Sequence, residues 1–242
     1  MTTWRGREIH YNRFMIATLA ALLSIGTGLP LDGHVQANNT LTNAEKKAGW
    51  KLLFDGRTTQ GWHNFKAKGV SEGWQVENGA LVIKDSSKAG DIITDEQFDW
   101  FELTLDFNMG KGENSGIMYR VTEEGKATWH SGPEIQLYDS TDGGVQKTGW
   151  LYQLYESKVD STKPAGEWNT MRILVSPTKS QTDVNGVKYY EYSFGSADFW
   201  ARVAKSKFNE FPMFAKAAKG SIAIQGDHGK VAFRNIKIRP IK

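Results

Sequence analysis

The segment GPEIQLYD (residues 132–139) places a carboxylate and an amide two positions apart in an otherwise apolar stretch. Alternate residues of a strand share one face, so Glu134, Gln136 and Tyr138 would point to one side and the intervening residues to the other. A carboxylate with hydrogen-bonding neighbours can transfer protons. The pattern therefore predicts a strand with one apolar face and one face suited to chemistry.

A second predicted strand, NSGIMYR (residues 114–120), carries Asn114, Gly116 and Arg120 on one face. If it pairs with the first strand, Arg120 and Glu134 would be cross-strand neighbours, and the cation could hold negative charge that develops beside a carboxylate base. The alternative is a surface salt bridge worth about 0–1 kcal/mol. Gly116 would let the backbone or a ligand come close on this face.

Three histidines follow residue 37, namely His63, His130 and His228. His130 lies four positions before Glu134, and His228 lies in the turn-forming sequence QGDHG, so both could reach a site at one end of a sheet. A lone histidine is more often a hydrogen-bonded structural residue. Metal binding is the rival use, although no spacing such as H-E-x-x-H supports it.

Several other chemistries are disfavoured. The chain has no cysteine, which excludes disulfides, thiolate metal sites and a cysteine nucleophile. It has no G-x-S-x-G motif and no phosphate-binding loop, and GKGENSG (residues 110–116) has the wrong spacing for a dinucleotide fingerprint. We therefore expect no nicotinamide cofactor in this chain.

The remaining pattern predicts an all-β protein. WQVENGALVI (residues 74–83) is typical of a hairpin with a type I′ turn at Asn78-Gly79, and FELTLDF (residues 101–107) alternates between a packed and a hydrated face. Asn235 interrupts the alternation of FRNIKI, which indicates a bulge in an edge or terminal strand. Further strands are expected at 114–120, 133–138, 150–154, 168–175, 188–194, 220–225 and 230–238, with one helix at 196–206 capped by Ser196. Many strands with one short helix favour a sandwich of two antiparallel sheets in one domain spanning residues 51–242.

Aromatic residues make up 12% of the chain, with nine tryptophans. Most should lie in the core, where aromatic rings bury large areas. Trp62, Trp129 and Trp150 lie beside predicted loops and are candidates for stacking on sugar rings.

Residues 1–37 combine a basic start, the apolar run FMIATLAALLSIGTGLP and small residues before Asn38, as secretory signals do. The apolar run is shorter than the roughly 20 residues of a spanning helix. We expect removal of 1–37, a polar lead-in at 38–50 with one helical turn, and a periplasmic protein of a Gram-negative bacterium, without membrane attachment after processing. The net charge is +3, with basic residues dispersed, so no nucleic-acid partner is expected.

The ordered motifs LLFDGRTTQGW, NSGIMYR, GPEIQLYD, KPAGEWN, SKFNEFP and GSIAIQGDHGKVAFRNIKI resemble the 3-keto-disaccharide hydrolase-like family over residues 48–242. This family, formerly a domain of unknown function, is described as 3-keto-glucoside 1,2-lyase and 2-hydroxy-glucal hydratase. The resemblance implies a concanavalin-like jelly-roll sandwich, exported in bacteria, whose concave face receives carbohydrate.

The resemblance also implies a reaction. A separate sugar 3-dehydrogenase oxidises carbon 3 of a glycoside, which acidifies the proton on carbon 2; a base removes that proton, the glycosidic oxygen leaves by β-elimination, and water adds to the 2-hydroxy-3-keto-glucal. One base and one enolate stabiliser suffice.

The roles expected on this basis are as follows. Glu134 or His130 transfers the proton, Arg120 and Gln136 hold the keto and hydroxyl oxygens, His228 is a second acid or ligand, and Asn114, Tyr152 and Glu167 are further substrate contacts. Apart from a divalent metal that would replace Arg120 as enolate stabiliser, with His130, Glu134 and His228 as ligands, no cofactor is expected.

Two other functions remain open. A non-catalytic carbohydrate-binding module would use the same sandwich and an aromatic platform without a base. A retaining glycosidase would need closely spaced acids on one strand, whereas Glu134 and Asp139 are five positions apart and would face opposite ways.

Overall fold

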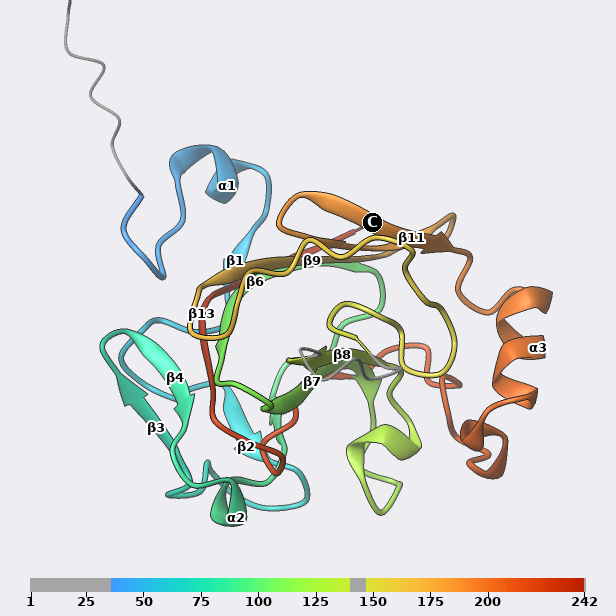
Figure 1. Cartoon of the computed structure of the whole chain (residues 1–242), viewed down its shortest axis with the longest axis horizontal. Helices are drawn as coiled ribbons and strands as arrows, with labels where there is room; N and C mark the ends of the chain where they lie inside the picture. The colour runs from blue at the N-terminus through green and yellow to red at the C-terminus, as the bar shows by residue number, and fades with distance from the viewer. Residues whose placement is uncertain (1–35, 140–146, 242) are drawn as a thin grey trace, which may run out of the picture. The chain divides into compact units, whose positions relative to one another are not determined.

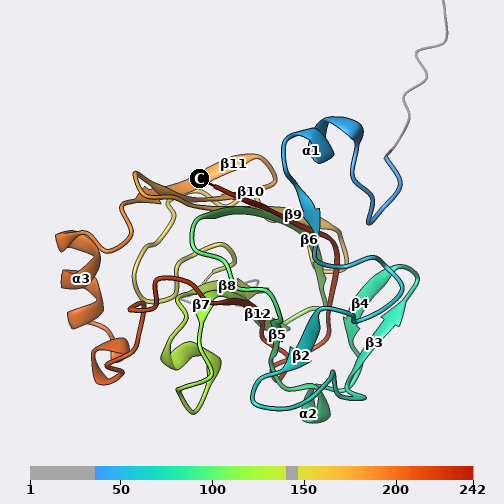
Figure 2. The same cartoon turned by 180° about the vertical axis from the view of Figure 1, so that it is seen from behind.

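Two antiparallel β-sheets lie face to face and enclose the hydrophobic core (Figures 1 and 2). The structure is a computed structural model that describes residues 36–139 and 147–241. Residues 1–35 of the predicted signal segment lie outside this part. Within the described residues, no helix has the length and apolar character needed to cross a membrane. The predicted all-β jelly-roll sandwich of the concanavalin type is confirmed.

The large sheet has eight strands and the small sheet has five. The large sheet runs in the order β11 (Val187–Tyr192), β10 (Ser180–Val184), β9 (Asn169–Val175), β6 (Phe101–Met109), β13 (Val231–Pro240), β4 (Ala80–Ile83) and β3 (Trp74–Glu77), with β1 (Lys51–Leu52) also paired to β13. The small sheet runs in the order β2 (Trp62–Asn64), β5 (Ile92–Thr94), β12 (Ser221–Ile224), β7 (Asn114–Val121) and β8 (Glu134–Tyr138).

Helical segments in the described residues are short. They are α1 (Asn43–Lys47), α2 (Ser86–Ala89), α3 (Ala197–Ala204) and the 3₁₀ turns η1 (Thr128–His130) and η2 (Lys207–Glu210). The predicted helix corresponds to α3, and Ser196 caps it by accepting a hydrogen bond from the Phe199 N–H. The packed face is formed by Phe199 and Val203, and Ala204 is exposed. The predicted helical turn in the lead-in is α1.

The predicted hairpin is confirmed as β3 and β4, joined by Asn78 and Gly79. Both residues have positive φ, 51° and 76°, as a type I′ turn requires. The prediction of a strand at 150–154 is wrong. Leu151 makes only isolated bridges there, because residues 149–152 follow the free edge of β8 as a looped segment. The pattern also missed β1, β2, β5 and β10, the first three of which have only two or three residues.

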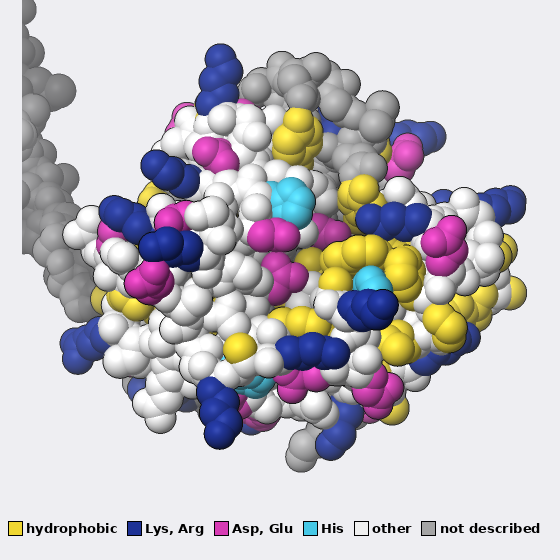
Figure 3. Space-filling view, turned by 90° about the horizontal axis from the view of Figure 1, so that it is seen from below, with side chains coloured by type: hydrophobic (Ala, Val, Ile, Leu, Met, Phe, Trp, Pro, Cys, Tyr) yellow, Lys and Arg dark blue, Asp and Glu magenta, His cyan; other side chains and the backbone are white. Residues whose placement is uncertain are grey.

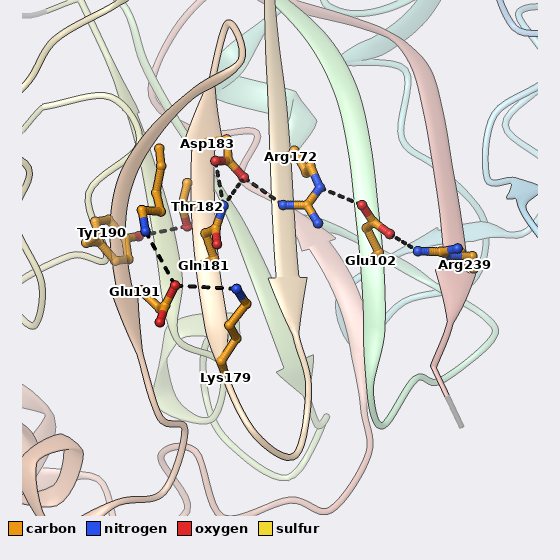
Figure 4. A network of polar contacts seen from close by, with 10 residues as sticks. Glu102, Arg172, Lys179, Gln181, Thr182, Asp183, Tyr190, Glu191 and Arg239 are labelled. Carbon is orange, nitrogen blue, oxygen red and sulfur yellow. Dashed lines mark hydrogen bonds and ion pairs between the residues drawn. The ribbon is translucent and has the colours of Figure 1, made fainter.

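Side chains of β6 (Phe101–Met109) alternate between the core and the outer face as predicted, but the outer face carries ion pairs as well as water-exposed groups. Glu102 is 7% exposed and lies between two guanidinium groups, those of Arg172 and Arg239, and Arg172 also bonds Asp183 Oδ2 at 2.8 Å. This charge ladder crosses four strands of the large sheet (Figure 4). The outer face of the large sheet is therefore occupied by mutually neutralising charges.

Asn235 forms the predicted bulge in β13, the last of the described strands, which has neighbours on both sides in the sheet. The register of β13 against β6 shifts between Arg234 and Lys237, and Asn235 has a φ of 53°. The bulge holds the lead-in. Asn39 N–H donates to Asn235 Oδ1 at 2.6 Å, Asn235 N–H donates to Asn39 Oδ1 at 2.8 Å, and Asn39 Nδ2 donates to the Gly79 carbonyl at 2.7 Å.

We predict that Asn39→Ala lowers the free energy of unfolding by about 2–3 kcal/mol, because it removes two hydrogen bonds of a buried residue and places alanine at positive φ. Urea unfolding measures the change. Asn38→Ala is the matched control, since Asn38 is exposed and its Oδ1 accepts only a 3.2 Å bond from Asn235 Nδ2. Equal losses in the two variants would contradict this account of the lead-in.

Candidate functional site: a buried carboxyl on the outer face of the small sheet

The register of the small sheet sets rows of residues across its outer face. One row runs His63, Ile93, Ala223, Met118, Glu134, from β2 to β8. The alternate residues of these strands, such as Ile117 and Ile135, face the main core, whereas Ile93, Met118 and Ala223 form a separate small cluster. Glu134 thus ends an apolar row on the face turned away from the core.

The next row brings Glu134 into contact with a glycine. Gly116 is aligned with Gln136 on β8, and it offers no side chain on the outer face. A Cβ built on Gly116 would lie 2.2 Å from Glu134 Oε1 and 2.8 Å from its carboxyl carbon. The carboxyl of Glu134 therefore occupies the space that a side chain at position 116 would fill.

Glu134 is held largely in its neutral form. It is 7% exposed, and burial raises the pKa of its carboxyl to about 8, with Lys207 opposing and Asp91 and Asp227 adding to the rise. A carboxyl with a pKa near neutrality can give and accept protons at physiological pH. This is the chemical property that the predicted role of Glu134 requires.

Lys207 is the cation beside this carboxyl. It begins η2, its N–H donates to Gln153 Oε1 at 3.1 Å, and its ammonium lies 4.7 Å from the ring centre of Trp129 and 4.6 Å from that of Tyr152. Such cation–π contacts hold an ammonium over aromatic faces. The Tyr152 N–H donates to the Glu134 carbonyl at 2.9 Å, which fixes Tyr152 beside β8.

Two acidic groups, Asp91 and Asp227, also act on the Glu134 carboxyl. A cavity of about 250 Å³ is lined by Asp91, Asp227 and His228 with Gln225 and Trp129 among others. Figure 3 shows acidic side chains beside a histidine on this face, next to a hydrophobic patch that contains a second histidine.

Asp91 is fixed by two donors. Thr128 Oγ1 donates to its Oδ2, and the Gly226 N–H donates to its Oδ1 at 3.1 Å. Burial nevertheless raises the pKa of the Asp91 carboxyl, since it outweighs these bonds. Asp227 and His228 are exposed and bonded to each other through Asp227 Oδ1 and His228 Nδ1.

Gln136 and Asn114 form an amide pair at the other end of the same face. Gln136 Nε2 donates to Asn114 Oδ1 at 2.7 Å, and Gln136 is 4% exposed. The structure thus brings Glu134, Gln136 and Asn114 onto neighbouring rows, with Tyr152 beside them.

The structure places Arg120 elsewhere. The strands β7 and β8 do pair, but their register places Met118, not Arg120, opposite Glu134, and β7 then bulges at Arg120, where φ is 56°. The bulge shifts the alternation by one residue, so Val121 takes the outward position beside Met118. Arg120 instead stacks on Trp100 and Phe194 and bonds Asp99 Oδ1 at 3.0 Å.

The remaining predicted residues are spread around the site or away from it. His130 packs against Trp129 and Phe211 near the cavity, and burial together with nearby lysines lowers the pKa of its imidazole. Glu167 is exposed in the loop before β9 of the large sheet.

The three candidate tryptophans differ in how deeply they are buried. Trp62 is 4% exposed in the core and is unavailable for stacking on a sugar, whereas Trp129 and Trp150 are half-buried.

Four residues of the site were missed by pattern alone: Asp91, Lys207, Gln225 and Asp227. Each lies at the end of a short element or in a turn, where periodicity carries little information. Gln225 and Asp227 belong to the QGDHG turn with His228, and Lys207 lies in the SKFNEFP segment, so three of the four lie within motifs on which the family resemblance rests.

His130, Glu134 and His228, which were expected as ligands of a divalent metal, do not come together in the structure. Among residues 36–139 and 147–241, no group of three His, Cys, Asp or Glu side chains could hold a metal ion. His130 lies in an aromatic cluster, and His228 is bonded to Asp227. The three residues expected as ligands therefore do not form a metal site in this geometry.

Comparison with known proteins identifies the family. The protein is a two-sheet β-sandwich, and its candidate site is a group of polar side chains on the outer face of the small sheet. The chain belongs to the family described as the 3-keto-alpha-glucoside-1,2-lyase-like domain, which matches residues 49–239. The predicted resemblance to this family of carbohydrate-processing proteins is confirmed.

Three relatives give the extent of the similarity. A 3-keto-disaccharide hydrolase of Bacteroides thetaiotaomicron is 28% identical over 228 residues, covering 79% of this chain and 78% of the relative. A crystal structure of a proposed glycosyl hydrolase from Parabacteroides distasonis is 33% identical, with a TM-score of 0.78, covering 85% of this chain and all of the other. A second such structure from that organism is 29% identical with a TM-score of 0.61, covering 79% of this chain and 99% of the other.

We predict that Gly116→Ala destabilises the protein by about 1–2 kcal/mol, because the new methyl group overlaps the Glu134 carboxyl. The loss should largely disappear when Glu134 is also changed to alanine, since the overlapping atoms are then gone. Urea unfolding of the single and double variants measures this coupling. Strictly additive losses would mean that Glu134 does not lie over Gly116.

Stability should also depend on pH through Glu134. The unfolded carboxyl ionises near the ordinary value of 4.5, whereas the folded one keeps its proton up to about 8, so the folded state binds more protons in this window. Stability contributed by this group therefore falls as pH rises from 4.5 to 8, by on the order of 4 kcal/mol, and stays low above 8.

The test compares wild type with Glu134→Gln, which cannot ionise. Thermal melts at pH 5 to 9 should show wild type losing stability relative to the variant up to pH 8, with no further loss above it. A difference independent of pH would contradict the raised pKa.

Proposed function

We propose that this protein cleaves 3-keto-glycosides by β-elimination and hydrates the resulting 2-hydroxy-3-keto-glucal, with Glu134 as the proton-transfer group. The observation that carries the proposal is the buried carboxyl over Gly116, whose pKa is raised to about 8. Elimination next to a ketone needs one base of this kind. The Bacteroides relative is named as a 3-keto-disaccharide hydrolase, which agrees with the net result of the two steps.

The first step breaks the bond between carbon 2 and its hydrogen. The ionised form of Glu134 takes the proton, and the electron pair moves onto the oxygen at carbon 3 as an enolate. The enolate then forms the double bond between carbons 1 and 2 while the glycosidic oxygen leaves and takes up a proton. In the second step water adds to that double bond, with its hydroxyl going to carbon 1 and a proton to carbon 2.

Lys207 is the group placed to stabilise the enolate. Its ammonium is the cation that acts on the Glu134 carboxyl, and the aromatic rings of Trp129 and Tyr152 hold it on the same face. A fixed cation next to the developing charge lowers the barrier of such a step. Lys207 thus takes the role that the sequence assigned to Arg120.

Gln136 and Asn114 suit the binding of hydroxyl groups. Gln136 lies on the row next to Glu134 and Asn114 on the row after it, and amide groups can both donate and accept hydrogen bonds. Tyr152 adds a polar aromatic side chain beside Lys207. His228 lines the cavity and His130 packs against Trp129, which also lines it, so either could supply a proton to the departing oxygen.

The cellular setting belongs to the same proposal. The secretory pattern of residues 1–37 supports export to the periplasm of a Gram-negative bacterium. Because the substrate must carry a ketone at carbon 3, a separate sugar 3-dehydrogenase would have to supply it.

The test uses the chain purified from residue 38 onward with a 3-keto-glucoside and with its unoxidised parent. Release of the aglycone from the keto compound alone, with transient enone absorbance, is the expected result. Release from the parent would indicate a direct glycosidase. Sugar binding without release would indicate a carbohydrate-binding module, the alternative that the half-buried Trp129 would serve.

Glu134→Gln should reduce kcat at least about 100-fold, because the amide cannot take the carbon-2 proton. In wild type, kcat/KM should rise with pH up to about 8, since only the ionised carboxyl acts as the base. Full activity of Glu134→Gln would contradict the assignment of the base.

Lys207→Met should lower kcat about 10- to 100-fold by removing the cation beside the enolate. It should also move the rise in kcat/KM to higher pH, because the ammonium favours the ionised form of Glu134. Lys205→Met is the matched control, as Lys205 is exposed at the end of α3. An unshifted pH profile in Lys207→Met would show that Lys207 does not act on Glu134.

A further inference from the structure

One buried acceptor near the site lacks a donor. Gln225 follows β12 directly and is 8% exposed, and its side-chain oxygen Oε1 is enclosed by protein atoms without a hydrogen-bond partner. A buried acceptor without a donor is costly, so native proteins seldom leave one unpaired. A neighbouring side chain that becomes a donor only when it is protonated would resolve this.

The register places Gln225 beside the Glu134 carboxyl. Ile224 is aligned with Ile117, and the Gln225 N–H donates to the Gly116 carbonyl at 2.9 Å, so Gln225 is opposite Gly116 and faces the same side. The Glu134 carboxyl occupies the missing side-chain position of Gly116. Along this row, the carboxyl therefore lies between the side chains of Gln225 on β12 and Gln136 on β8.

A neutral carboxyl is a donor that is easily overlooked, because an ionised carboxylate can only accept. Glu134 needs an acceptor for its hydroxyl when it is protonated, and Gln225 Oε1 needs a donor. Gln136 on the other side donates its Nε2 to Asn114, and its Oε1, unlike that of Gln225, is not an enclosed acceptor that lacks a donor. We propose that Gln225 is a positioning residue that accepts, through Oε1, the hydrogen bond from the protonated carboxyl of Glu134.

The charges around Glu134 are compatible with a protonated carboxyl. The titratable groups on the surrounding segments are Asp91 before β5, Asp227 and its partner His228 after β12, Lys207 on η2, and Tyr152 beside β8. The two aspartates and burial favour the neutral form, and Lys207 opposes them. A hydrogen bond to Gln225 would stabilise the neutral form further.

Such a bond would set the orientation of the catalytic group. With its hydroxyl directed to Gln225, the carboxyl cannot rotate freely, and its other oxygen is held toward the open side of the sheet face. This catalytic meaning rests on the proposed function, whereas the hydrogen bond itself does not.

Infrared spectroscopy of the substrate-free protein tests the bond. The carbonyl stretch of the protonated Glu134 is the band that Glu134→Gln removes at pH 6. In Gln225→Met, which keeps the volume but removes the acceptor, this band should move to higher frequency, because the hydroxyl loses its hydrogen bond. Gln136→Met is the matched control on the other side of the carboxyl and should leave the band in place.

An unmoved band in folded Gln225→Met would overturn the proposal. If that variant does not fold, carbon-13 NMR of the labelled side-chain carbonyl of Gln225 in wild type decides the matter. Its chemical shift should follow the ionisation of Glu134 between pH 6 and 9 and should be flat in Glu134→Gln. A shift that is flat in wild type as well would also overturn the proposal.

Kinetics separate this proposal from the proposed function. If wild type cleaves the 3-keto-glucoside, Gln225→Met should lower kcat about 10-fold with little change in KM, since it misorients the base without removing a substrate contact. If wild type has no such activity, the proposed function fails, and the infrared and NMR results still decide whether Gln225 holds the proton of Glu134.

Discussion

The enclosure of one carboxyl in the space left by a glycine is the constraint on which the site depends. Glu134 can lie flat against the small sheet only because Gly116 on the neighbouring strand has no side chain. That position removes water from the carboxyl and brings it near two aspartates, which together raise its pKa. A residue of ordinary exposure at this position would be ionised and tightly hydrated at neutral pH, and would be a weaker base toward carbon.

The two outer faces of the sandwich differ in whether their buried glutamate is paired with arginine. On the large sheet, Glu102 is flanked by two arginines, so buried charges neutralise one another across the strands (Figure 4). On the small sheet, Glu134 has no such partner, and the nearest cation, Lys207, rests on aromatic rings. The first arrangement pairs charges across the strands, whereas the raised pKa of Glu134 lowers stability at neutral pH, a cost that is common at functional sites.

Much of this architecture could be predicted from the sequence. Alternation in FELTLDF and the Asn78-Gly79 turn predicted β6 and the hairpin correctly, because side-chain period and turn conformation are local properties. The shared strand face of Glu134 and Gln136 was predicted for the same reason. The pairing of their strand with 114–121 followed as well.

The errors arise where local rules fail. Arg120 was assigned to the wrong environment because a single bulge reverses the alternation of β7 beyond Met118, and no residue in NSGIMYR announces it. Asp91 and Lys207 reach the site from a short strand and a 3₁₀ turn that are distant in sequence. Their proximity to Glu134 is a consequence of strand order, which a single sequence does not reveal.

The central claim is that the glycosidic bond breaks because a proton is first removed from carbon 2. It is tested most directly with a 3-keto-glucoside that carries deuterium at carbon 2. The account predicts slower aglycone release than from the hydrogen compound, together with exchange of the deuterium into water, both abolished in Glu134→Gln. Release at equal rates from the two compounds, with the deuterium retained in the product, would contradict it.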